Sequence, residues 1–356
     1  MFFKIFLWIR IGNKLMTSNN LRDAHSNNFD FIRIFAALTV LYSHHFYLTG
    51  RVVPSVMGIE TYGGAAVMVF FIVSGYLVTS SWYHDPNIIR FAWRRILRIW
   101  PALTLVVVCT VFILGPVVTN LSLSEYFSHG STYDYFYNLR MNVVFLLPGV
   151  FETNPAPLSV NGSLWTIPLE VQCYVVLAFA GLFGLLRSKF IFVAFVAIYM
   201  VWFILRSSAD LYGVIHYPRE LGAYFLAGAG LFALKDYWRR CPWITLLVCM
   251  LIACLLWISG WRYLASWVLL PYAVIFFGVN STPIIKSFGK WGDPSYGIYL
   301  IAFPVQQTVI KYLWPIWGFW GTMALSTLIT IFLAFLSWNF VEKWFLKFKP
   351  KKKIIK

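Results

Sequence analysis

The feature that most constrains this chain is a series of continuous apolar runs, each about as long as a membrane span. A bilayer core about 30 Å thick requires roughly 20 apolar residues in a helix. The runs do not alternate with the period of two that a barrel strand shows, so we predict an all-α polytopic membrane protein. About ten spans are expected, at residues 29–49, 62–83, 97–119, 164–186, 189–206, 219–235, 243–260, 263–279, 294–312 and 317–341.

The composition excludes a soluble domain, because 60% of the residues are hydrophobic and only 12% are charged, against about 25% charged in soluble domains. We expect one membrane domain at residues 28–345 and no appended soluble domain. A cytoplasmic or interfacial segment, 1–27, precedes it, and a basic cytoplasmic tail, 346–356, follows it. The first residues alternate basic and aromatic side chains over too short a run to span, which favours an interfacial helix over a signal peptide.

The net charge of +16 is distributed as in a membrane protein rather than a nucleic-acid-binding protein. With the amino terminus inside, 22 Lys and Arg residues fall in inner segments and 6 in outer segments. By the positive-inside rule, this asymmetry predicts that both termini are cytoplasmic. The basic tail is then expected to lie against anionic membrane lipid, and no nucleic-acid partner is expected.

The five cysteines lie in or beside apolar spans without metal-ligand spacing, so we expect small core residues and neither disulfides nor a metal site. They are Cys109, Cys173, Cys241, Cys249 and Cys254.

One long segment outside the spans, about 120–163, is predicted to lie on the outer side. It is rich in Tyr and Asn, and Pro155, Pro157 and Gly162 oppose regular structure in its second half. Such a loop is suited to stacking on a carbohydrate, although a plain connecting loop explains the segment equally well.

Arg33 and His44 lie within the first span, where a charged guanidinium costs at least ~2.5 kcal/mol and so indicates function. Eleven residues place them about 16 Å apart and within roughly 20° of the same helix face. Asp30 precedes Arg33 by three residues and is a candidate ion-pair partner. His45 points about 100° away, which favours His44. The alternative is that Asp30 and Arg33 anchor the helix end while the histidine packs against neighbours.

Four arginines precede Pro101 and form what we call the arginine cluster, namely Arg90, Arg94, Arg95 and Arg98. Arg95 and Arg98 are spaced i, i+3. They lie about 60° apart on a helix and can point into one site. Guanidinium pairs bind phosphate through forked hydrogen bonds, so the cluster fits a phosphorylated cytoplasmic ligand. The alternative is an ordinary positive-inside anchor.

Further polar residues interrupt the later spans. Ser74 supplies a hydroxyl in the second span, and Gly75 permits close helix approach. Glu170 begins the fourth span, where a carboxylate is expensive unless it faces a polar cavity or a partner. The remaining polar candidates are Gln172, Ser295, Tyr296, Tyr299, Gln306, Gln307 and Glu342.

Six segments in order, covering about residues 28–345, resemble the membrane acyltransferase family 3. They read FDFIRIFAALTVLYSHH, VFFIVSGYL, RRILRIWP, SLWTIPLEVQCY, SYGIYLIAFPVQQ and WNFVEK. Members are ten-helix bacterial O-acyltransferases that modify surface polysaccharides, lipopolysaccharide and other exported acceptors. The resemblance therefore implies a multi-pass O-acetyltransferase of the bacterial inner membrane.

The resemblance assigns roles to particular residues. It matches the family's Arg and His to Arg33 and His44, its Arg-x-x-Arg to Arg95 and Arg98, its Ser-Gly to Ser74 and Gly75, and its Trp and Glu to Trp165 and Glu170. This chain departs from the family in two places. Many members have a His where this chain has Ala302, and Glu342-Lys343-Trp344 stands where members often read Glu-Arg-Pro.

The resemblance and the residue chemistry together predict acetyl transfer from cytoplasmic acetyl-CoA to a glycan hydroxyl, without a metal. Arg95, Arg98 and Ser74 would bind the donor, and Arg33, together with Asp30, would orient either the His-bearing face or the donor. His44 would act as a base or briefly carry the acyl group, and Glu170 would bind acceptor hydroxyls or act as a second base.

The alternative function is a transporter or flippase of a lipid-linked glycan, although no paired broken helices are evident. The acceptor, the acyl chain length, the oligomeric state and the need for a partner stay open.

Overall fold

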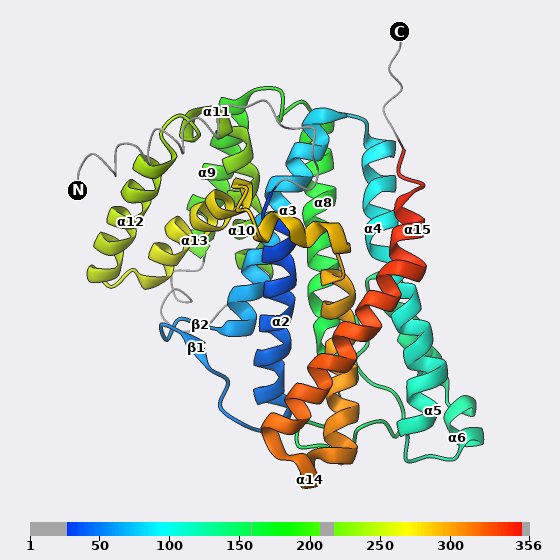
Figure 1. Ribbon diagram of the computed structural model, residues 1–356. Helices are drawn as coiled ribbons and strands as arrows, with labels where there is room; N and C mark the ends of the chain where they lie inside the picture. Colours follow the sequence, from blue (N-terminus) through cyan, green and yellow to red (C-terminus); the bar gives the residue numbers. More distant parts are fainter. Residues whose placement is uncertain (1–26, 158, 207–216, 351–356) are drawn as a thin grey trace.

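The computed structural model describes residues 27–157, 159–206 and 217–350, and these are mostly helical (Figure 1). Seven segments are long and apolar enough to cross a membrane, which confirms a multi-pass helical membrane protein. They are α2 (Phe29–Leu48), α3 (Tyr62–His84), the run Ile88–Val118, the run Gly162–Leu182, α9 (Lys189–Arg206), α13 (Arg262–Val279) and the run Ser295–Leu346. The expected count of about ten spans is not established.

Two of the predicted spans are shorter helices. They are α10 (Tyr217–Ala233) and α12 (Pro242–Ile258), of 17 residues each. Two others form one 43-residue element, α14 (Ser295–Ser337), which breaks at Gly318 with a φ of 57° and a ψ of −162°. In Figure 1 this element runs to the lower end of the bundle, turns there and returns toward α15 (Lys343–Leu346).

Close packing of α3 against α10 builds the centre of the bundle. A Cβ on Gly75 would lie 1.9 Å from the carbonyl oxygen of Phe225, and one on Gly228 would lie 2.1 Å from that of Ile72. The two backbones approach where side chains are absent, as small residues allow in membrane helices. The predicted packing role of Gly75 is confirmed.

The arginine-bearing helix begins earlier than predicted. We expected the third span to start at residue 97, but α4 (Ile88–Cys109) already includes the arginine cluster. The Asn87 side chain accepts a hydrogen bond from the backbone N–H of Arg90 and caps the helix. Asp85 pairs with both Arg90 and Arg94 at 2.6 Å, and their hydrogen bonds and charges hold its pKa well below the usual range. These polar contacts stabilise turns that hydropathy alone does not reveal.

A short β-hairpin in the connection between α2 and α3 was not expected. Strand β1 (Ser55–Val56) pairs antiparallel with β2 (Glu60–Thr61), through a turn in which Met57 and Gly58 have positive φ. The all-α expectation therefore misses one hairpin.

The long segment that we predicted to lie outside is partly helical. Its first half contains α6 (Leu123–Ser128), α7 (Gly130–Asp134) and the 3-10 turn η2 (Tyr135–Arg140), whereas residues 141–157 and 159–161 are irregular, as predicted. Tyr126 and Tyr135 are fully buried, whereas Tyr133 and Tyr137 are 46% and 42% exposed. Half of these aromatic rings therefore pack the loop instead of being displayed on it.

The remaining elements connect or end the helices. They are the π-helical turn η1 (Thr110–Leu114), α5 (Gly115–Val118), η3 (Gly162–Trp165), α8 (Thr166–Leu182), α11 (Lys235–Trp238), η5 (Ile285–Trp291) and η6 (Trp338–Glu342). All five cysteines are free. Cys173 and Cys249 pack half-buried against the core, whereas Cys241 and Cys254 are exposed, so the expectation of core positions is wrong for the last two. Residues 1–26 and 351–356, which include most of the predicted interfacial segment and part of the basic tail, lie outside the described residues.

Candidate active site

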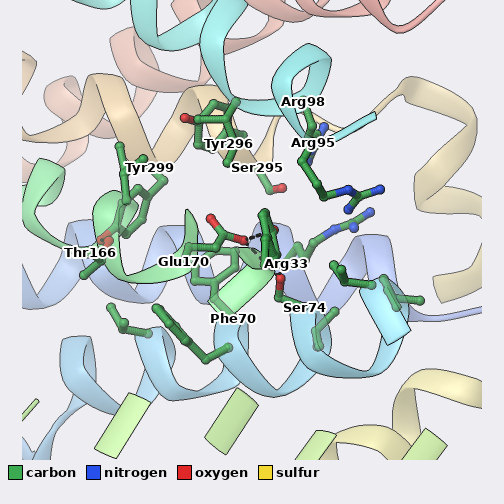
Figure 2. A pocket seen from close by; sticks show the side chains of 18 residues that line it. Arg33, Phe70, Ser74, Arg95, Arg98, Thr166, Glu170, Ser295, Tyr296 and Tyr299 are labelled. Atoms are coloured by element: carbon green, nitrogen blue, oxygen red, sulfur yellow. Dashed lines mark hydrogen bonds between the residues drawn. The ribbon is translucent and has the colours of Figure 1, made fainter. Parts of the chain in front are cut away.

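A cavity of about 120 Å³ lies between α2, α3, α4, α8 and the start of α14. Five of the six predicted site residues line it, namely Arg33, Ser74, Arg95, Arg98 and Glu170. Figure 2 shows the arginines at one side, the Thr166–Tyr299 pair at the opposite side, and Ser74 and Glu170 between them. We call the first side the arginine end and the second the Tyr299 end.

Ion pairs organise the arginine end. Arg33 pairs with Asp30, as predicted, and its Nη2 also lies 3.1 Å from Oδ2 of Asp293. The Nη2 atom of Arg98 donates to the same Oδ2 at 2.5 Å. Glu342 lies 3.9 Å from Arg98 and is 2% exposed. Asp293, just before α14, and Glu342, just after it, thus contact arginines of α2 and α4.

Asp293 was not predicted as a site residue, although it sits in the quoted WGDPSYG segment. It is only 8% exposed. Burial alone would raise its pKa, but the adjacent Arg33 and Arg98 hold the pKa well below the usual range for an aspartate. The sequence signal that could have indicated Asp293 was its position, directly before the predicted span 294–312 and shortly after Lys286 and Lys290.

Arg95 differs from the other two arginines of the cavity. Its guanidinium lies 5.6 Å from the Tyr174 ring centroid and 5.9 Å from that of Phe91. Within the described residues it forms no ion pair with a carboxylate, and its buried Nε has no hydrogen-bond partner. It therefore stands at the cavity wall without a carboxylate in direct contact.

A hydrogen-bonded triad occupies the middle of the cavity. The Ser74 hydroxyl donates to Oε1 of Glu170 at 3.1 Å and lies 2.9 Å from the Tyr174 hydroxyl, which donates to the same oxygen. The Glu170 carboxylate is thus held by two hydroxyl donors from α3 and α8. Gln172, two residues further on, is exposed and does not line the cavity.

Tyrosines and a threonine form the Tyr299 end. The hydroxyls of Thr166 and Tyr299 are 2.6 Å apart. The buried hydroxyl of Tyr296, which also lines the cavity, has no hydrogen-bond partner among the described residues. Buried polar atoms without partners are rare in native proteins, so such a hydroxyl is available to a ligand.

His44 does not line the cavity. Its ring packs edge-to-face on Phe303, with 5.2 Å between the centroids. Phe303 follows Tyr299 by four residues, which is about one helical turn along α14. The buried Nδ1 of His44 has no partner in the described part of the chain. His44 is therefore next to the Tyr299 end and about 16 Å along α2 from Arg33.

His45 has the opposite environment. It is completely buried, and its Nε2 lies 3.1 Å from the carbonyl oxygen of Phe319 and 3.2 Å from the hydroxyl of Thr322. Its Nδ1 lies 3.2 Å from Nε2 of Gln306. Since an amide nitrogen donates, Nδ1 accepts and Nε2 carries the proton. Both nitrogens thus join α2 to the two halves of α14.

This arrangement can hold an anion at the arginine end and a polar group beside a fixed carboxylate. No group of three His, Cys, Asp or Glu residues among those described is placed to hold a metal ion.

Comparison with known proteins places the chain among acyl-transferring enzymes. The family profile described as an acyltransferase domain matches residues 26–339. The chain is 34% identical over 333 residues to the O-acetyl transferase of Shigella phage Sf6, covering 90% of this chain and 96% of that protein. It is 24% identical over 339 residues to nodulation protein 10 of Rhizobium leguminosarum bv. viciae, covering 83% and 87%. No solved structure matches.

Proposed function

The chain belongs to the acyltransferase domain family, and we propose that it is a membrane O-acetyltransferase that moves acetyl from acetyl-CoA to a hydroxyl of a surface or exported glycan. The observation that carries this proposal is a single cavity in which three arginines face a carboxylate held by Ser74 and Tyr174. The phage relative, an O-acetyl transferase, supports acetyl as the group transferred.

The donor binds with its phosphates at the arginine end. Coenzyme A carries several phosphate groups, and guanidinium groups hold phosphate through paired, charge-assisted hydrogen bonds. Arg95 supplies a guanidinium that no carboxylate contacts among the described residues, and Arg33 and Arg98 supply further N–H donors. The extended pantetheine arm then carries the thioester past Ser74 and Glu170 to the Tyr299 end.

His44 acts as the base at that end. A neutral imidazole removes the proton from the acceptor hydroxyl, and the oxygen attacks the thioester carbonyl. The carbon–sulfur bond breaks, and the departing thiolate takes up the proton, so the products are an acetyl ester and free coenzyme A. A second route passes the acetyl group through a ring nitrogen of His44 before the acceptor enters. Trapping of an acetylated His44 in the absence of acceptor distinguishes the two routes.

Glu170 serves the acceptor or the thioester end of the donor. Oε1 is engaged by Ser74 and Tyr174, so Oε2 is the oxygen left to accept a hydrogen bond from a substrate hydroxyl. Ser74 therefore acts through Glu170. The sequence suggested that Ser74 binds the donor, and we now propose that it positions Glu170 instead.

Both termini and the arginine end are proposed to face the cytoplasm of a bacterial inner membrane. The 22 to 6 asymmetry of Lys and Arg supports this orientation. Donor then enters from the side where acetyl-CoA is made, and the acceptor meets His44 nearer the outer side.

The decisive experiment compares surface glycans from cells with and without the gene by mass spectrometry. We expect a mass gain of one acetyl group per repeat unit, lost on mild alkaline treatment, only when the gene is present. In parallel, the purified protein in lipid nanodiscs receives acetyl-CoA labelled in the acetyl group and de-O-acetylated glycan from the deletion strain. A glycan that crosses the membrane in a gene-dependent way without gaining acetyl would contradict the proposal and indicate transport.

A further inference from the structure

We propose that Asp293 is a positioning residue for the donor, which fixes Arg33 of α2 and Arg98 of α4 relative to each other so that both hold a donor phosphate. This inference rests on the proposed function, because it assigns how the arginine end is assembled for acetyl-CoA.

The contacts of the two carboxylate oxygens of Asp293 are divided. Oδ2 accepts from Arg98 at 2.5 Å and lies 3.1 Å from Nη2 of Arg33. Oδ1 accepts from the Ser295 hydroxyl at 2.5 Å and from its backbone N–H at 3.4 Å. Ser295 thus sets the orientation of the carboxylate, and the other oxygen is left for the two arginines.

Each arginine keeps donors for a ligand after this contact. A guanidinium has five N–H groups, and Asp293 engages only Nη2 of each residue. The Nε of Arg33 is buried without a partner among the described residues, although Arg33 lines the cavity. Asp293 therefore contacts one nitrogen of each guanidinium group and leaves the remaining N–H groups of both for a ligand.

Electrostatics supports a fixed arrangement. Two guanidinium groups brought to one oxygen repel each other, and the repulsion is strong where water is scarce. A shared carboxylate offsets it, while Arg95, which forms no ion pair among the described residues, adds positive charge that attracts an anion. Without Asp293, Arg33 and Arg98 would separate, and among the described residues Arg33 would keep only Asp30 as an ion-pair partner.

The chain offers a matched control. Asp85 also bridges two arginines of the same helix, Arg90 and Arg94 at 2.6 Å, but none of these three residues lines the cavity. Asp85→Asn therefore removes a comparable ion-pair bridge at a place where no donor is expected to bind.

The test measures coenzyme A affinity by calorimetry and acetyl-transfer kinetics, using the full-length protein in nanodiscs. Asp293→Asn should weaken coenzyme A binding and raise the KM for acetyl-CoA about tenfold, with kcat within about twofold, since second-layer partners typically contribute 10- to 100-fold. Asp85→Asn should leave both donor values within about twofold. If Asp293→Asn does not fold, Ser295→Ala, which frees Oδ1, should give a smaller change in the same direction.

A double-mutant cycle separates positioning from general structural support. In an Arg98→Gln background, Asp293→Asn should have little further effect on the donor KM, because it acts through Arg98. In an Arg95→Gln background, Asp293→Asn should raise the donor KM by the same factor as in the wild-type protein, so that the two effects multiply.

Three results would overturn the inference: an unchanged or lowered donor KM in Asp293→Asn, an equal rise in Asp85→Asn, or independent effects of Asp293→Asn and Arg98→Gln. A wild-type protein that neither binds coenzyme A nor transfers acetyl would instead refute the proposed function.

Discussion

His45 of α2 and Gln306 of α14 are hydrogen-bonded through Nδ1 and Nε2 at 3.2 Å, whereas the adjacent His44 has a buried nitrogen without a partner in the described residues. The two neighbouring histidines therefore have different hydrogen-bond environments. His45 stabilises the junction of α2 with α14, and His44 is available for chemistry.

Replacement of His44 by Ala should reduce acetyl transfer at least ~100-fold, the usual effect of losing a general base, without affecting folding. His45→Ala should retain much of the activity per folded molecule but lower the melting temperature, because it removes the buried hydrogen bonds that join α2 to Gln306 and Phe319 in the two halves of α14. Labelled acetyl transfer and thermal unfolding in matched membrane preparations check both. An active His44→Ala together with an inactive, stable His45→Ala would reverse the assignment.

Arg95 and Arg98, predicted as an equivalent pair, should differ on mutation. Arg95→Ala should raise the donor KM roughly tenfold to a hundredfold through loss of a charge-assisted contact, with little loss of stability. Arg98→Ala should raise the KM and also destabilise the protein, because Asp293 and Glu342 lose a buried cation. Lys at position 95 should restore part of the affinity. Unchanged donor kinetics in both Ala variants would show that the cluster is a topological anchor.

Ser74 and Gly75 are adjacent but should fail in different ways. Ser74→Ala removes one donor to Glu170 and should lower kcat by about tenfold with normal expression. Gly75→Ala places a Cβ 1.9 Å from the Phe225 carbonyl oxygen and should prevent accumulation of folded protein. Size-exclusion profiles and kinetics distinguish the two. A well-folded Gly75→Ala protein would contradict the observed closeness of α3 and α10.

Donor affinity should fall in alkaline solution because of Lys349. Burial, with the neighbouring charges of Arg98, Arg95 and Arg33, lowers its pKa to about 8, against the opposing effect of Asp293. The ammonium form attracts an anion and is lost as pH rises through that value, so the KM for acetyl-CoA should increase between about pH 7 and about pH 9. Lys349→Arg stays charged and should flatten this profile. An identical alkaline rise in Lys349→Arg would exclude Lys349 as its source.

Topology can be read from cysteine labelling. In a cysteine-free background, Arg140→Cys should react with an impermeant maleimide applied outside intact cells, because residue 140 is exposed and lies in the segment that we predict to be outside. Lys286→Cys, also exposed, should react only after the membrane is permeabilised. The opposite pattern would invert the orientation of the cavity.

Local spacing was sufficient for much of the site. An i, i+3 relation placed Arg95 and Arg98 in one cavity, and the cost of a carboxylate in a span pointed to a polar surrounding for Glu170. Asp293 was missed because its partners lie 195 and 260 positions away, and no periodicity encodes such a contact. Likewise, the early start of α4 depends on Asn87 and Asp85, whose polar contacts hydropathy does not register.

The turn at Gly318 has a consequence for biogenesis. Because α14 reverses there, Glu342 comes back to within 3.9 Å of Arg98, a residue inserted more than two hundred positions earlier. During synthesis Arg33 and Arg98 therefore lack Asp293 and Glu342 as partners until residue 293 and then the last helix emerge from the ribosome. A nascent chain therefore cannot complete the proposed donor site before these carboxylates are made, and we expect activity to require correct insertion of the final helix.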